Sequence, residues 1–98
     1  MMKLMHKSQL IGTIVNPIRE GMSMAGDLEL TEAADRYLEM FAFLVGKKTA
    51  HEEPPYPESD LWGWTIEYGD GNVREIIGCP AVSNNGTIIQ WRWGKQIN

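Results

Sequence analysis

Cysteine is scarce in this chain: Cys79 is the only one, so no disulfide can form within the 98 residues. A small chain without such a staple is typical of a reducing compartment, and we expect a cytoplasmic protein. Long apolar runs are missing too, and no stretch reaches the roughly 20 residues that a membrane-spanning helix needs. Lys3, His6 and Lys7 interrupt the first ten residues, so we expect no secretion signal. These absences argue against a disulfide-rich secreted scaffold and against a membrane protein.

Motifs that carry chemistry are also missing. The sequence contains no HExxH or CxxC metal pattern, no GxSxG nucleophile elbow, and neither GxxxxGK nor GxGxxG for phosphate binding. The only histidines are His6 and His51, and His51 is followed by two glutamates that seldom converge on one ion with it. The thirteen acids allow some carboxylate pair, but they are expected to be exposed, without the burial that would raise a pKa. We therefore expect no enzyme, no metal and no cofactor.

Positive charge is sparse and unevenly placed. Nine bases face thirteen acids, and every acid lies between Glu20 and Glu75. Within that stretch four bases oppose the thirteen acids, which leaves a net charge of −9. The chain thus lacks the basic patch that direct nucleic-acid binding requires. A negative field of this kind favours a basic partner surface, although acids can also serve only to keep a small domain soluble.

The length and a hydrophobic content of 43% predict a single domain over residues 1–98. We expect an α+β fold in which two or three N-terminal helical segments (4–46) pack on one face of a C-terminal antiparallel meander (61–94) of three or four strands. An acidic, proline-rich loop (49–60) would connect the two parts. The helices would cover the face of the sheet that carries the tryptophans.

The first helical region is predicted over residues 4–25, where apolar residues recur at a period of 3.6. Its stripe consists of Leu4, Ile11, Ile14, Val15, Ile18, Met22 and Ala25. Pro17 conflicts with one continuous helix. It either kinks the helix or begins a second one that Asn16 caps.

The second helical region is predicted to begin after Thr31 and to end at Gly46. Opposite its apolar stripe, Glu32, Asp35 and Glu39 form an acidic ridge. Phe43 falls beside the charged face, where it would be an anchor for a partner, unless a loop or the sheet covers it.

The loop over 49–60 holds three prolines and places acids around Tyr56. Its acids are Glu52, Glu53, Glu58 and Asp60. Loops of this length are unusual in small domains unless they have a role, so this one is either a connector or a binding element.

The sheet is predicted from alternating residues before one turn signal, at 69–72, and after another, at 84–86. Tryptophans occur in two pairs, Trp62 with Trp64 and Trp91 with Trp93, and each i, i+2 pair would share one face. Four indoles in a small domain are expected to fill the core. An aromatic floor that stacks a small ligand is the alternative.

The leading functional hypothesis is a non-catalytic protein–protein interaction module that docks on a basic surface of another protein, without binding nucleic acid or membrane itself. The acidic ridge, the acidic loop, Phe43 and Tyr56 would make the contact. Size and charge resemble acidic inhibitors or adaptors, such as phage-type inhibitors of nucleic-acid-binding defence enzymes and immunity proteins. The alternative is a small-ligand-binding domain that uses the tryptophans. A third interpretation is a homo-oligomer formed through Phe43 and the methionine-rich first segment.

Overall fold

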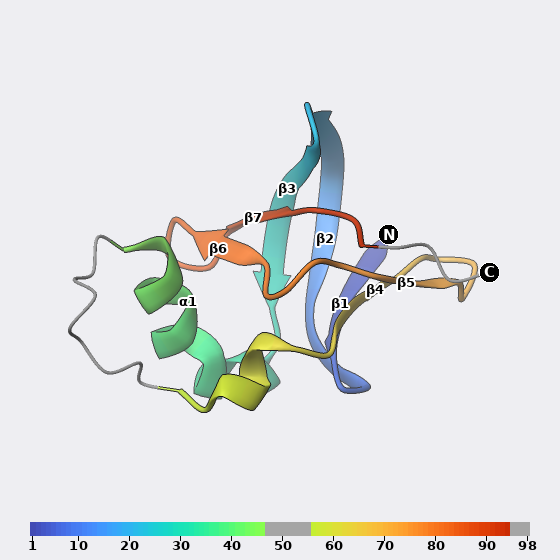
Figure 1. Ribbon diagram of the computed structural model, residues 1–98. Coiled ribbons are helices and arrows are strands. Elements are labelled where there is room, and N and C mark those ends of the chain that lie inside the picture. Colours follow the sequence, from blue (N-terminus) through green and yellow to red (C-terminus); the bar gives the residue numbers. More distant parts are fainter. Residues whose placement is uncertain (47–55, 95–98) are drawn as a thin grey trace.

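The first thirty residues of the chain form strands and not helices. In the computed structural model, which describes residues 1–46 and 56–94, they run as an antiparallel meander of β1 (Met2–His6), β2 (Gln9–Glu20) and β3 (Ser23–Leu30) (Figure 1). The helix predicted over 4–25 is therefore wrong. Two-residue turns join the strands: Lys7 and Ser8 adopt φ values of 48° and 72°, and Gly21 adopts 63°. Such left-handed conformations match the twist of a tight hairpin.

Side-chain shape explains why strands form here. Isoleucine, valine and threonine, which are concentrated between Ile11 and Ile18, are stiff at χ1 and favour the pleated sheet. Pro17 sits in a β-bulge, where the register with β3 shifts between Val15 and Ile18 and Asn16 takes a φ of 53°. Ile18 is 56% exposed and Met22 81% exposed, although a helical stripe would have buried both. The 3.6 period of this segment is therefore accidental.

The C-terminal strands do not form a sheet of their own. They make two hairpins, β4 (Trp64–Glu67) with β5 (Val73–Glu75) and β6 (Ala81–Ser83) with β7 (Ile88–Trp91). β4 pairs with β1 and β7 pairs with β3, so the hairpins flank the N-terminal meander. The result is one seven-stranded antiparallel sheet in the order β5-β4-β1-β2-β3-β7-β6. The predicted separate meander of three or four strands is wrong, although both predicted turns are present.

The two sides of the sheet meet beyond β5 and β7. Ile76 pairs with Trp93, the amide of Ile77 donates to the carbonyl of Arg92 at 2.9 Å, and the amide of Gly94 donates to the carbonyl of Glu75 at 3.0 Å. The Trp93 ring stacks on Tyr68 with a centroid distance of 5.9 Å. Because these contacts join segments from opposite halves of the sheet, the sheet curves strongly.

One helical run, and not two or three, packs against this sheet. The 3-10 helix η1 (Glu32–Tyr37) continues directly into α1 (Leu38–Val45), and a short 3-10 helix η2 (Glu58–Leu61) lies beside them (Figure 1). The helical prediction between Thr31 and Gly46 therefore agrees with the structure, while the rest of 4–46 does not. We call η1, α1, η2 and the adjoining Trp62 the helical layer.

The core lies between the helical layer and the curved sheet. Its buried apolar residues come from both layers and include Leu4, Ile14, Tyr37, Trp64 and Ile89. Within the described ranges, no helix has the length and apolar character to cross a membrane.

Candidate functional site

The helical run is oriented by contacts at its start and along its inner face. Thr31, just before η1, makes no side-chain cap and instead donates its hydroxyl to the carbonyls of Leu10 and Ile11 in β2, at 2.8 and 3.1 Å. Ala34, Tyr37, Met40 and Phe41 face the core and are buried. The opposite side of the run is therefore fixed toward solvent.

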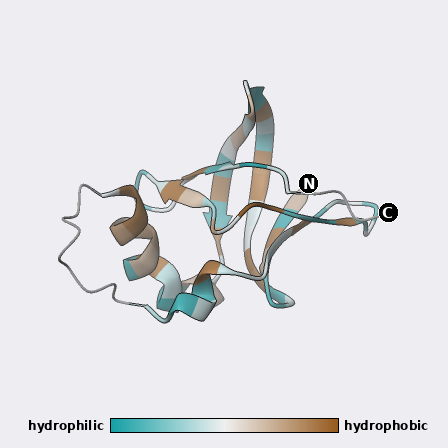
Figure 2. Cartoon of the chain, in the orientation of Figure 1, coloured by the Kyte–Doolittle hydropathy of each residue, from teal (hydrophilic) through white to brown (hydrophobic). Residues whose placement is uncertain are grey.

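The predicted acidic ridge lies on that outer side. Glu32, Asp35 and Glu39 are all exposed, as is Glu58 of η2. Residues three apart eclipse in a 3-10 helix, so Glu32 and Asp35 form one row that leads to Leu38 at the start of α1. Figure 2 shows hydrophilic η1 and η2 next to a mainly hydrophobic α1.

The apolar part of α1 is not fully covered by the described residues. Leu38 and Val45 are each 45% exposed and Leu44 is 40% exposed, although all three are large apolar side chains. The sequence LEMFAFLV has one charged residue, Glu39, so this helix is apolar on nearly all sides. A helix of that kind is normally buried on all sides. The helical layer therefore combines an acidic row with an apolar surface, an arrangement that sequence reasoning did not anticipate.

In the described part of the chain, grooves border α1 on two sides. One, of about 480 Å³, runs between α1 and the β6–β7 turn and is lined by Leu38, Ala42, Val45 and Val82 among others. The other, of about 300 Å³, lies between Leu44, Trp62 and the segment Gly78–Ala81. Both grooves have mainly apolar walls, so large apolar side chains can enter them.

Trp62 is the most exposed tryptophan. Its side chain is 60% exposed, whereas Trp64 is 2% exposed, so the two do not share a face as the i, i+2 spacing predicted. The reason is Gly63, whose φ of 86° places Trp62 outside β4. Trp91 is buried and Trp93 is half-buried beneath the Arg74 guanidinium, at 4.4 Å from the ring centroid. The four indoles thus make no open platform.

A buried hydrogen-bond chain holds the backbone of Trp62. The Nε2 of His6 lies 2.8 Å from the carbonyl oxygen of Trp62, which can only accept, so Nε2 carries the proton. The neutral ring then accepts at Nδ1 from the Tyr37 hydroxyl, at 2.6 Å. Arg36 in turn donates to the Tyr37 hydroxyl oxygen. The chain links β1, η1 and the residue that follows η2.

Burial keeps His6 in this neutral form. The ring is 1% exposed and lies against the Trp64 ring, with a centroid distance of 4.5 Å and an interplanar angle of 31°. Desolvation lowers the pKa of His6 below 6.5, and the hydrogen bond to the Trp62 carbonyl and the charge of Asp60 only partly oppose that shift. A general acid or base must reach its substrate, and this imidazole has no access to solvent. His6 therefore acts as a structural group.

Asp60, which was predicted to face a partner, is turned inward. It is 7% exposed, and its carboxylate lies 3.8 Å from the Arg36 guanidinium. Its main-chain carbonyl accepts from the indole nitrogen of Trp64 at 2.7 Å. Asp60 thus belongs to the support of the helical layer and not to its outer surface.

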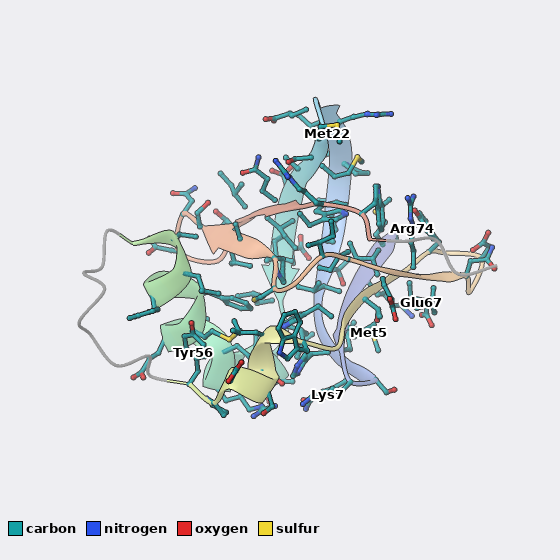
Figure 3. The ribbon with its side chains drawn as sticks, viewed as in Figure 1. Met5, Lys7, Met22, Tyr56, Glu67 and Arg74 are labelled. Carbon is teal, nitrogen blue, oxygen red and sulfur yellow. The ribbon has the colours of Figure 1, made fainter. Side chains whose placement is uncertain are left out.

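The two predicted aromatic anchors contact each other. Phe43 and Tyr56 are both half-buried, with ring centroids 5.7 Å apart in an edge-to-face arrangement. Figure 3 shows Tyr56 at the helical end of the molecule, far from Arg74. Each ring therefore covers part of the other. Glu52 and Glu53 of the predicted acidic loop lie outside the described residues.

The described residues offer neither a cluster that would bind a metal ion nor a reactive thiol. No cluster of three or more His, Cys, Asp or Glu side chains occurs within 1–46 and 56–94. Burial raises the pKa of the Cys79 thiol to about 12, so a reactive thiolate does not form near neutral pH.

Comparison with known proteins adds no assignment. No family model, no curated protein and no solved structure matches this chain. We therefore infer the function of this protein from its fold and its surface chemistry.

Sequence reasoning placed Leu38 and Tyr37 on the apolar stripe of the helix, and Tyr37 is buried as expected. It missed the exposure of Leu38 and the hydrogen bond between Tyr37 and His6. The signal for His6 was the alternation of MKLMH, in which Leu4 and His6 point inward from one strand. That alternation is short, and the same residues also belong to the segment 4–25, for which a helix was predicted.

Proposed function

We propose that this protein is a non-catalytic interaction module whose helical layer docks on a basic surface of another protein. One observation carries the proposal: exposed acids and exposed large apolar side chains share the same layer. Protein interfaces combine a buried apolar centre with a polar rim in this way. We assign the role of an aromatic anchor to Trp62, because its carbonyl is held by His6 and its side chain is 60% exposed.

Charge indicates the kind of partner. The helical layer carries five acids, Glu32, Asp35, Glu39, Glu58 and Asp60, and one base, Arg36, whose charge is matched by Asp60. A surface of this sign attracts a basic surface and speeds the encounter with it. A protein that binds nucleic acid offers such a surface, and occupation by an acidic module excludes nucleic acid by overlap and by repulsion. An inhibitor or adaptor of a nucleic-acid-binding enzyme in a reducing compartment such as the cytoplasm fits this chemistry.

Paired charge reversals test the proposal. The helical-layer variant Glu32→Lys/Glu39→Lys and the sheet-side variant Glu20→Lys/Glu75→Lys change the net charge equally, and all four residues are exposed. Each tagged protein is used to capture partners from the native host, and association rates are then measured with the captured partner at two salt concentrations.

We expect the helical-layer variant to lose about tenfold or more in association rate, with a weaker salt dependence, and the sheet-side variant to change about twofold. Trp62→Ala should increase the dissociation rate, because an aromatic anchor is removed. If both reversals have equal effects, net charge and not the helical layer determines binding, and the proposal is refuted.

A further inference from the structure

Three side chains on the outer side of α1 have the spacing of a helix-packing seam. Leu38, Ala42 and Val45 occupy positions i, i+4 and i+7, which is the spacing of successive core positions where two helices pack. All three are exposed, and they form one wall of the 480 Å³ groove whose opposite wall is the β6–β7 turn. Leu38 and Val45 at the two ends of this seam each remain 45% exposed.

We propose that this groove, the α1 groove, receives an amphipathic helix of the partner protein. Apolar side chains of that helix would enter between Leu38, Ala42, Val45 and the turn Ser83–Gly86, and its Lys or Arg side chains would face Asp35 and Glu39. This inference rests on the proposed function and specifies the partner element that docks there. It is the helix-in-groove mode of recognition.

The shape of the groove favours a helix. Ala42, the middle residue of the seam, is small and lets a second backbone approach closely, while Leu38 and Val45 on either side offer apolar contact. The volume of about 480 Å³ lies within the range of sites that hold several apolar groups.

The charges favour a basic partner over a second copy of this chain. Asp35 lies one 3-10 turn before Leu38 and Glu39 follows Leu38 directly, and both acids are exposed. Two copies that pack α1 against α1 would bring these acids toward each other, and like charges across an interface oppose association. A helix with lysine or arginine beside its apolar stripe is complementary at the same positions.

Three synthetic peptides of about 18 residues probe the groove on the full-length protein. The first has leucines at i, i+4 and i+7 with flanking lysines, the second has the same composition in scrambled order, and the third replaces lysine by glutamate. Affinity is measured by the fluorescence anisotropy of the labelled peptide. We expect the first peptide to bind about tenfold or more tightly than either of the others.

Two matched variants locate the binding. Ala42→Gln places a longer polar side chain in the seam, and Ala25→Gln makes the same change at a half-buried alanine of β3 that lines neither groove beside α1. We expect Ala42→Gln to weaken binding of the first peptide about tenfold and Ala25→Gln to change its affinity less than about twofold. Circular dichroism and thermal unfolding of both variants establish that each one is folded.

The remaining outcomes overturn the inference in distinguishable ways. If the scrambled lysine peptide binds as tightly as the first and Glu32→Lys/Glu39→Lys abolishes both, the groove is not a helix site, but the proposed acidic docking surface stands. If neither lysine peptide binds, the groove is not a site for a basic helix, and only capture of a partner through the helical layer would then uphold the proposed function. A concentration-dependent dimer that Ala42→Gln abolishes would assign the seam to a second copy.

Discussion

Replacing Tyr37 by Phe tests the buried chain that supports the helical layer. Tyr37 has no exposed surface, and its hydroxyl donates to Nδ1 of His6 at 2.6 Å. Loss of the hydroxyl leaves that nitrogen buried without a donor and removes the acceptor used by Arg36. An unsatisfied buried polar group costs about 1–3 kcal/mol. In a domain of about 100 residues each 1 kcal/mol lowers Tm by about 4–8 °C, so we expect a fall of about 4–24 °C.

Urea unfolding followed by tryptophan fluorescence measures this loss. Tyr68→Phe is the matched control, because it removes the same atom from a half-buried tyrosine whose ring stacks on Trp93. The control should change stability by less than about 0.5 kcal/mol. In a double-mutant cycle, Tyr37→Phe and His6→Phe should be non-additive by about 1 kcal/mol, because each removes the same hydrogen bond. A Tyr37→Phe protein as stable as wild type, or strict additivity in the cycle, would refute the reasoning.

Other predictions concern pH, backbone geometry and thiol reactivity. Because burial lowers the pKa of His6, the unfolded chain binds a proton below pH 6.5 that the native state excludes. The free energy of unfolding should therefore fall as the pH decreases from about 6.5. In His6→Phe, part of this pH dependence should be lost. Gly63→Ala should lower the free energy of unfolding by about 1–2 kcal/mol, because φ at this position is 86° and the new Cβ would lie 2.9 Å from Cγ of Lys7. Equal stability of the variant and the wild type in urea would contradict this geometry. Iodoacetamide should modify Cys79 at neutral pH far more slowly in the native protein than in urea, because its pKa is about 12; equal rates would refute its burial.

Local signals in the sequence predicted only the local parts of this fold. The turn at Asn84–Gly86, the helical run from Glu32 to Val45 and the alternation of Trp64 and Ile66 each depend on neighbouring residues, and the structure contains all of them. The pairing of β1 with β4 and of β3 with β7 joins residues about sixty positions apart. Such pairings leave no local mark, and in β2 the apolar positions also fitted a helical period.

The candidate surface was predictable in its charge but not in its apolar part. Glu32, Asp35 and Glu39 are exposed as the ridge predicted, because acids at the start of a helix remain in water. Asp60 could not be placed from sequence, since its burial depends on Arg36 across the fold. The prediction that Trp62 shares a face with Trp64 is wrong, because the positive φ of Gly63 interrupts the strand alternation between them.

The central claim, that the helical layer is the docking surface, is tested most directly by hydrogen–deuterium exchange on the full-length protein bound to its captured partner. The account predicts slower exchange within residues 32–45 and 58–62, with the exposed β2–β3 turn at Gly21–Met22 unchanged. Protection of that turn, with the helical layer exchanging as in the free protein, would contradict it.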